Sequence, residues 1–266
     1  MNDTTRPLDA AAVASALGDA WARVDVVERT GSTNADLTAG AAGLPDRTVL
    51  VAEHQEAGRG RLSRTWVSPP GSGLTVSVLL RPVGVPPSRF GWLPLLAGLA
   101  LLDTVRGLAD VPCGLKWPND LLLGPGSRKV AGILAEVADA GRAVVVGIGV
   151  NVASAPPDQA GATSLHAEGV AVERADLLVA LLGRLAERET AWRAGRGDPD
   201  ATRLRADYRA GCSSLGSEVR VELPGGAMYT GTAEDVDVDG RLLLLDAAGR
   251  RRAIAAGDVV HLRPAG

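Results

Sequence analysis

The pattern of apolar and polar positions divides the chain into a long mixed part and a shorter part made of strands. Apolar residues recur at helical spacing in 8–22, 90–108 and 173–195, which predicts three helices. A shorter helix is expected to begin at a cap formed by Ser32 or Thr33 and to end near Gly40. The strands expected in this part are 24–29, 48–53, 74–80, 115–117, 120–123, 129–137 and 142–150.

The pattern of apolar residues changes after about Gly211, from long segments to short runs. Glycine-containing turns at 225–226, 239–240 and 248–249 separate short apolar runs, and this spacing is typical of a small barrel of SH3-like size. The strands expected here are 218–223, 227–236, 241–246, 250–254 and 259–262. We therefore expect an α+β domain over 1–212, a mixed sheet with flanking helices, followed by an SH3-like β-barrel over 213–266.

Composition excludes several classes of protein. The 266 residues are 46% apolar and 22% charged, which fits a folded globular chain rather than a disordered one. The net charge of -3 argues against binding nucleic acid through bulk charge. We found neither an uninterrupted run of about 18 apolar residues nor a signal-peptide core after the polar N-terminus, so we expect a cytoplasmic protein without a membrane partner. Cys113 and Cys212 are expected to be reduced thiols.

A loop is expected at 54–66, a stretch without apolar periodicity, and its part 58–66 is rich in arginine. It carries Arg59, Arg61 and Arg64 within six residues, together with two glycines and Trp66. Guanidinium groups suit phosphate and carboxylate oxygens, and an indole offers a flat face for a ring. Because like charges repel, we expect the loop to be poorly ordered until an anion arrives. The alternative is an ordinary solvated loop.

The two lysines in the chain also stand out, because the other 26 basic residues are arginines. Lys116 begins Lys-Trp-Pro-Asn-Asp, where Asn119 and Asp120 place an amide beside a carboxylate. Such a cluster can hold a Mg²⁺-bound polyphosphate, with the lysine on the phosphate oxygens. The alternative is a turn with a packed tryptophan. Lys129 leads an apolar strand in which Gly132 would admit a ligand close to the backbone.

A further glycine-thinned strand, 146–151, ends at Asn151, whose amide suits an adenine edge. It is not a dinucleotide fingerprint, because no helix start follows it. The sequence also lacks a phosphate-loop motif and a Gly-x-Ser-x-Gly motif. Its three scattered histidines argue against a zinc site or a Ser-His-Asp triad.

Taken in order, these stretches resemble the biotin protein ligase family, in its monofunctional form without a DNA-binding domain. The resemblance covers roughly 24–266, and its motifs lie at 32–34, 55, 58–66, 116–120, 129–134 and 147–151. It implies an enzyme that joins biotin to ATP as biotinyl-5′-AMP, releases pyrophosphate, and then transfers biotin to a lysine of a carrier protein. The substrates would be ATP and biotin, with Mg²⁺.

The resemblance also implies roles for individual residues. Those expected at biotin are Ser32, Thr33, Asn34, Gln55, Gly58, Arg59, Gly60, Arg61, Lys129, Gly132 and Gly147. Those expected at ATP or the adenylate are Arg61, Arg64, Trp66, Lys116, Asn119, Asp120, Lys129 and Asn151. The catalytic candidates are Lys129, Arg61 and Lys116. The terminal barrel is expected to serve chiefly the transfer to the acceptor.

Two departures and several alternatives stay open. Leu62-Ser63 stand where an Arg-Gly pair is common, which affects the expected retention of adenylate. The first motif begins at Ser32, which leaves no room for a winged helix-turn-helix, so we expect no nucleic-acid partner. The acceptor would be a carrier domain of acyl-CoA carboxylase or pyruvate carboxylase, and the ligase a monomer or a weak homodimer. The rival functions are a lipoate or octanoate ligase and a non-catalytic biotin sensor.

Overall fold

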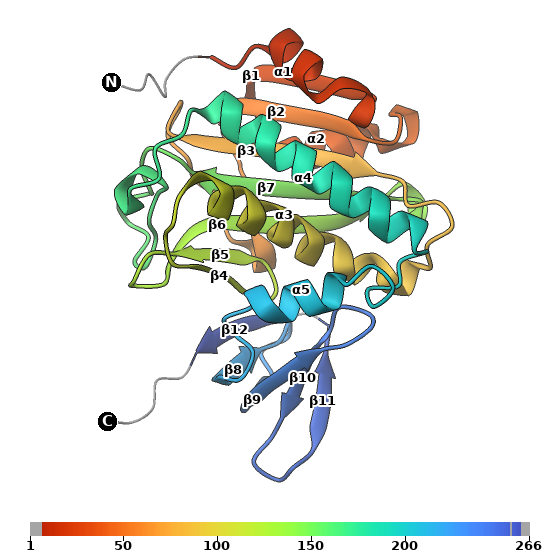
Figure 1. Cartoon of the computed structure of the whole chain (residues 1–266), viewed down its shortest axis with the longest axis vertical. Coiled ribbons are helices and arrows are strands. Elements are labelled where there is room, and N and C mark those ends of the chain that lie inside the picture. The colour runs from red at the N-terminus through yellow and green to blue at the C-terminus, as the bar shows by residue number, and fades with distance from the viewer. Residues whose placement is uncertain (1–6, 256, 262–266) are drawn as a thin grey trace.

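The computed structural model describes residues 7–255 and 257–261, which form two sheets joined by helices (Figure 1). The larger sheet has seven strands in the order β1-β2-β3-β7-β6-β5-β4. β1 and β2 are parallel and the other neighbours are antiparallel, so the sheet is mixed as predicted. The strands are β1 (Arg23–Thr30), β2 (Thr48–Gln55), β3 (Gly73–Leu80), β4 (Cys113–Lys116), β5 (Asp120–Leu123), β6 (Arg128–Ala138) and β7 (Ala143–Asn151).

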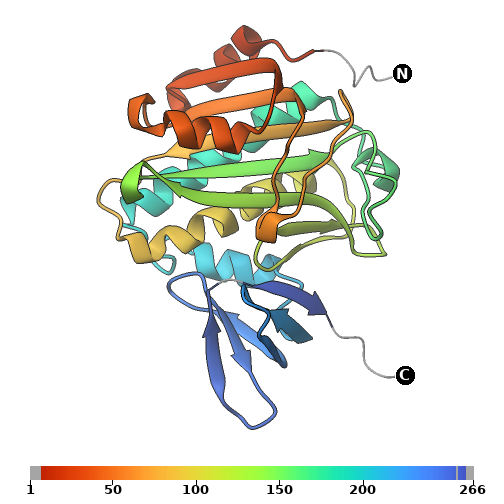
Figure 2. The same cartoon turned by 180° about the vertical axis from the view of Figure 1, so that it is seen from behind.

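Helices cover the two faces of this sheet unequally. α1 (Ala10–Leu17), α3 (Trp92–Leu108) and α4 (Arg174–Ala194) lie on one face (Figure 1). The opposite face carries α2 (Thr33–Gly40) and the loop after β2, and much of it is uncovered by helices (Figure 2). Asymmetric cover of this kind leaves one side of the central strands available for a ligand.

α3 is the core helix. The stretch Pro87–Leu108 is long and apolar enough to cross a membrane by composition, but 67% of its most apolar part is buried inside the protein. Trp92, Leu96 and Leu101 are fully enclosed among side chains of the sheet and α4. Its apolarity therefore reflects its position between the sheet and the other helices.

Local signals set the ends of two predicted helices. Ser32 caps α2, accepting a hydrogen bond from the Ala35 amide at 3.5 Å. The helix predicted over 8–22 is shorter, because Gly18 takes a left-handed φ of +55° and ends α1. A 3₁₀ turn, Gly18–Ala20, follows. Trp21 then lies outside the helix, buried with its indole donating to the Leu182 carbonyl at 3.2 Å.

The smaller sheet has five antiparallel strands in the order β11-β10-β9-β8-β12. The strands are β8 (Glu218–Glu222), β9 (Met228–Val236), β10 (Leu242–Leu245), β11 (Arg251–Ile254) and β12 (Asp258–His261). All five were predicted, and residue 262 of the last prediction lies outside the described residues. A helix, α5 (Leu204–Gly211), precedes this sheet and was not predicted.

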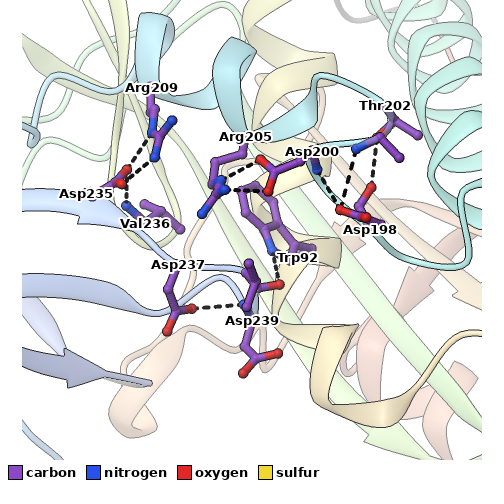
Figure 3. Close-up of polar contacts among 12 residues, drawn as sticks. Trp92, Asp198, Asp200, Thr202, Arg205, Arg209, Asp235, Val236, Asp237 and Asp239 are labelled. Atoms are coloured by element: carbon purple, nitrogen blue, oxygen red, sulfur yellow. Dashed lines mark hydrogen bonds and ion pairs between the residues drawn. The ribbon is translucent and has the colours of Figure 1, made fainter.

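The smaller sheet packs against the larger part of the protein, with α5 between the two sheets (Figure 1). Figure 3 shows one side of the contact, where Arg209 of α5 pairs with Asp235 of β9 at 2.6 Å. There the Trp92 indole donates to the Val238 carbonyl at 3.0 Å. The Trp117 indole donates to the Gly240 carbonyl at 3.3 Å. The turn between β9 and β10 is thus held by two tryptophans of the larger part.

Candidate active site

A cavity of about 220 Å³ lies where the loop after β2 meets β6, β7 and the smaller sheet. Its lining brings together most of the residues that the sequence singled out. The predicted residues that line it are Ser32, Thr33, Asn34, Gln55, Arg59, Gly60, Arg61, Arg64, Trp66, Lys116, Asn119, Asp120, Lys129, Gly132 and Gly147. These predicted residues lie as much as 115 positions apart in the sequence.

Two predicted residues do not line the cavity. Gly58 closes the base of the loop, where its carbonyl accepts from the Trp66 amide at 2.8 Å. A Cβ at Gly58 would press on the Trp66 carbonyl and lie 2.9 Å from Gln55 Nε2, so a side chain cannot be accommodated. Asn151 is buried, and its Nδ2 donates to the Thr163 carbonyl at 3.0 Å. Its buried Oδ1 has no hydrogen-bond partner among the described residues.

One end of the cavity is a network of neutral polar groups. Gln55 Oε1 accepts from the Thr33 amide at 2.9 Å and from the Thr33 hydroxyl at 3.0 Å. This fixes the orientation of the Gln55 amide, because its oxygen is held and its NH₂ faces the loop. The Thr33 hydroxyl also lies 2.7 Å from the hydroxyl of Ser77, a buried residue of β3 that lines the cavity and that the sequence analysis missed.

Asn34 extends this network to β6 and β7. Its Oδ1 accepts from Ser77 Oγ at 2.7 Å, and its Nδ2 donates to Glu136 Oε2 at 2.8 Å. A Cβ at Gly147 would lie 2.9 Å from the Asn34 amide carbon. Gly147 is therefore needed to admit the Asn34 side chain, which in turn orders the hydroxyls at this end.

The arginine loop forms a hairpin over the cavity. The Gly60 amide donates to the Arg64 carbonyl at 2.6 Å, and a β-bridge joins Arg59 to Thr65. Each guanidinium reaches a separate acceptor. Arg59 pairs with Glu136 at 3.2 Å, Arg64 pairs with Asp258, and Arg61 donates to the Gly257 carbonyl at 3.1 Å. These contacts offset the mutual repulsion that the sequence alone suggested, and the mobility of the loop stays a prediction.

Arg61 is the most enclosed of the three loop arginines. Burial lowers the pKa of its guanidinium below the ordinary value, and the carboxylates of Asp258 and Asp120 partly offset this. Its Nε is buried and has no hydrogen-bond partner among the described residues. A partly buried cation with an unused donor stabilises an anion more strongly than an exposed one does, because less water competes for it.

Trp66 lies on the floor of the cavity, over the glycines of the two central strands. A Cβ at Gly149 would come 2.7 Å from two atoms of the indole, and one at Gly132 would come 3.2 Å from another. The indole nitrogen is buried without a partner among the described residues, and Lys129 Nζ lies 5.9 Å from the ring centroid. Gly132, which was expected to admit a ligand, and Gly149 make room for this ring.

The two lysines line the same cavity in different environments. Lys129 Nζ lies 2.7 Å from a carboxylate oxygen of Asp120. Lys116 ends β4, and no Asp or Glu among the described residues lies within 4.0 Å of its ammonium. Asn119 donates through Nδ2 to the Ile133 carbonyl at 3.0 Å, which ties the turn after Lys116 to β6.

The smaller sheet also lines the cavity, which the sequence analysis did not anticipate. Glu222 of β8 and Asp258, Val259 and Val260 of β12 belong to the lining, as does Gln159 of the segment after β7. No sequence motif marks these residues, because their place depends on how the sheets pack. The expectation that the barrel chiefly serves transfer stays a prediction. Among the described residues, no group of three or more His, Cys, Asp or Glu side chains could hold a metal ion.

The mixed sheet and its cationic cavity define a ligase of the biotin and lipoate class. The Biotin/lipoate A/B protein ligase family matches residues 26–152, and the Biotin protein ligase C terminal domain matches residues 214–262. The chain belongs to the biotin protein ligase family.

Relatives and solved structures agree with this assignment. The chain is 50% identical over 253 residues to the biotin–[acetyl-CoA-carboxylase] ligase of Mycobacterium tuberculosis, covering 92% of this chain and 91% of the relative. It is 34% identical to the bifunctional ligase/repressor BirA of Bacillus subtilis, over 87% of this chain and 71% of that protein. The biotin protein ligase of Aquifex aeolicus in complex with biotin and ATP superposes with a TM-score of 0.74 at 27% identity. This match covers 90% of this chain and 98% of the other.

Proposed function

We propose that this protein is a biotin–[acetyl-CoA-carboxylase] ligase. The biotin carboxylate attacks the α-phosphorus of ATP, pyrophosphate leaves, and biotinyl-5′-AMP forms. The ε-amine of a carrier lysine then attacks the acyl carbon, AMP leaves, and an amide results after the amine loses a proton. The observation that carries the proposal is a single cavity that joins a neutral hydrogen-bonding end to a cluster of cations.

The neutral end suits the ureido ring of biotin. A ring with both N–H donors and a carbonyl acceptor needs fixed partners of both kinds in a narrow slot. Ser32, Thr33, Asn34 and Gln55 supply hydroxyls and amides there, and the network through Ser77 orders them. Gly60 and Arg59 line the slot from the loop side. Gly132 makes room for the Trp66 ring and Gly147 for the Asn34 side chain, so both act on the slot through those neighbours.

The cationic end suits the carboxylate and the nucleotide phosphates, which must approach each other although both are anionic. Arg61 and Lys129 both line the cavity, and we assign them to the reacting α-phosphate and carboxylate. Fixed donors at the site of developing charge commonly contribute about 3–4 kcal/mol each to the transition state. We assign Lys116 and Arg64 to the other phosphate oxygens, and Trp66 to the base. Asn151 does not line the cavity, so we assign it no contact with the nucleotide.

Magnesium enters this scheme as part of the substrate, Mg-ATP. Magnesium typically keeps several waters and takes one or two carboxylates plus phosphate oxygens, which agrees with a cavity that offers only isolated acidic groups. Asp120 and the amide oxygen of Asn119 are the groups that would face it. The ion would neutralise charge on the polyphosphate, while the arginines and lysines of this chain orient the reacting atoms.

The arginine loop is proposed to protect the adenylate. A mixed anhydride is hydrolysed when water reaches it, and a closed loop excludes water. Two arginines of the loop pair with the carboxylates of Glu136 and Asp258. The carboxylate of biotin or a phosphate of ATP would take the place of these carboxylates as partners of the arginines. Leu62 stands exposed at the tip of the hairpin, in the position where the family commonly has an arginine.

The remaining assignments concern partners and organisation. We propose that the acceptor is a biotin carboxyl carrier domain of an acyl-CoA carboxylase or of pyruvate carboxylase. We propose a cytoplasmic monomer or weak homodimer without a nucleic-acid partner, in keeping with its net charge of -3. We divide the chain into a ligase domain, 1–212, and a barrel, 213–266, in keeping with its two sheets.

Calorimetry tests the choice of biotin over lipoate. Biotin has a ureido ring that pairs with the Thr33 and Gln55 groups, whereas the dithiolane ring of lipoate leaves those groups unpaired. We therefore expect biotin to bind and lipoate to bind at least about 100-fold more weakly, because buried polar groups reject an analogue that cannot pair with them. Tighter binding of lipoate would favour the rival lipoate or octanoate ligase.

A further inference from the structure

The segment that connects the two sheets runs alongside β4. Cys212 forms a parallel bridge with Leu115, and Ser213 donates to the Leu115 carbonyl through its amide at 2.8 Å and its hydroxyl at 2.9 Å. This pairing places Ser214 directly beside Trp117, one residue past the end of β4. The first residues of the smaller sheet's part of the chain therefore contact the backbone that carries Lys116.

Ser214 and His261 form a hydrogen-bonded relay at this contact. Ser214 is completely buried, and its Oγ accepts from the Trp117 amide at 3.1 Å. The same Oγ lies 2.9 Å from His261 Nε2, at the end of β12. Because the oxygen already accepts from Trp117, its own proton is available to a neutral His261 that accepts at Nε2. Burial, and then the charge of Lys116, lower the pKa of His261, which favours this neutral form.

Lys116 depends on its backbone for its position. Lys129 is held by Asp120, whereas no acidic side chain among the described residues pairs with Lys116. The Lys116 carbonyl accepts from the Asn119 amide at 3.1 Å, and the Trp117 indole is anchored to Gly240 at 3.3 Å. The Trp117 amide, bonded to Ser214, is the group that immediately follows Lys116. Loss of that bond would free the end of β4 next to the lysine.

We propose that Ser214 and His261 are positioning residues for the nucleotide. Through the Trp117 amide they fix the Lys116 ammonium at the phosphate end of the cavity, so the smaller sheet sets the affinity for ATP from behind the site. This inference rests on the proposed function, which places Lys116 at the nucleotide. Neither residue needs to touch ATP or biotin.

The test compares His261→Leu, Ser214→Ala and the conservative His261→Gln. We expect the first two to raise the Kd and KM for Mg-ATP about five- to tenfold, the loss that one buried hydrogen bond commonly causes. The KM for biotin should stay within about twofold, because the neutral end of the cavity is untouched. His261→Gln retains an acceptor near the position of Nε2 and should restore most of the affinity. Mg-ATP binding is read by calorimetry, and biotin-dependent pyrophosphate release gives the KM values.

Arg209→Ala provides the matched control. Figure 3 shows Arg209 paired with Asp235, so this variant removes an ion pair between α5 and β9 without touching the Lys116 turn. It should lower the melting temperature and leave the Kd for Mg-ATP unchanged. A double-mutant cycle adds a second readout, since His261→Leu should have little further effect once Lys116→Ala has removed the ammonium.

The outcomes separate this inference from the proposed function. The positioning role is overturned if His261→Leu shifts the Kd for Mg-ATP no more than Arg209→Ala does. It is also overturned if the effects of His261→Leu and Lys116→Ala on this Kd are additive in the double mutant. If the wild-type protein binds Mg-ATP but releases no pyrophosphate with biotin, the proposed function is wrong. The positioning role is then tested by the Kd values for Mg-ATP alone. Absence of Mg-ATP binding in the wild-type protein overturns both.

Discussion

Gly149 offers a sharp test of how the loop closes, because it lies beneath the Trp66 indole. A Cβ at this position would lie 2.7 Å from two ring atoms, whereas ordinary van der Waals contact begins at 3.4 Å. Indole Cε2 would be nearer still to the new Cβ, so in Gly149→Ala the ring must retreat by about 1 Å. β7 is paired on both sides, with β3 and β6, so the exposed hairpin rather than the strand is expected to move.

The size of the effect follows from the clash. Overpacking by one methyl group commonly costs about 1–3 kcal/mol. If that cost falls on the closed loop alone, the closed population decreases about 5- to 150-fold relative to open forms. Because opening the hairpin relieves the strain, the melting temperature should change little. The variant should therefore form biotinyl-5′-AMP but lose it faster than the wild-type protein does.

The assay mixes the protein with biotin and Mg-ATP, removes free ligands by rapid gel filtration, and follows the adenylate that remains bound. We expect its loss to be at least about fivefold faster in Gly149→Ala. Gly183→Ala is the control, because this glycine lies in α4 and a Cβ added to it would meet nothing within 4 Å. Equal retention in the two variants would refute the view that Trp66 seals the cavity by resting on Gly149.

Three further predictions test separate features. Lys129→Ala should slow biotin-dependent pyrophosphate release about 100- to 1,000-fold, with Lys129→Arg between it and the wild type; a normal rate in the alanine variant would contradict our assignment. Iodoacetamide should label Cys113 before Cys212, since burial raises the pKa of the Cys212 thiol, and equal labelling by peptide mass would contradict this. The folded pKa of His261 is lowered below 6.5, so its contribution to stability is complete above pH 6.5 and is lost as the pH falls through the folded pKa. Urea unfolding at a pH of about 7.5 and of about 5.5 measures how far the free energy of unfolding falls between the two. The fall should be smaller for His261→Gln than for the wild type, and an equal fall in both proteins would contradict the argument.

The sequence predicted features whose signals are local. Each strand of the larger sheet has its own run of apolar residues, and the Ser32 cap sets the start of α2 within a few positions. Most of the motif residues reach one cavity because they lie in the loop after β2, at the start of α2, at the ends of β4 to β6 or within β6 and β7. The end of α1 was misjudged because Leu17 and Trp21 continue the apolar spacing, while Gly18 stops the helix between them.

Other features depend on contacts between distant parts of the chain. α5 has only eight residues, and its buried side chains, Leu204 and Tyr208, are too few to give a clear periodic pattern. Asp258 reaches Arg64 across 194 positions, because the smaller sheet packs against the loop. The Ser214–His261 relay arises in the same way, from a connection that pairs with β4. No short motif marks such contacts, so they could not be predicted from the sequence without the packing of the smaller sheet against the rest of the protein.

The most direct test of the account is intact-mass analysis of a carrier domain incubated with this protein, biotin and Mg-ATP. The cationic cavity should join biotin to AMP and pass it to one lysine, so the carrier should gain one biotinyl group only when both substrates are present. A carrier of unchanged mass, with no biotinyl-5′-AMP in the mixture, would contradict the central claim.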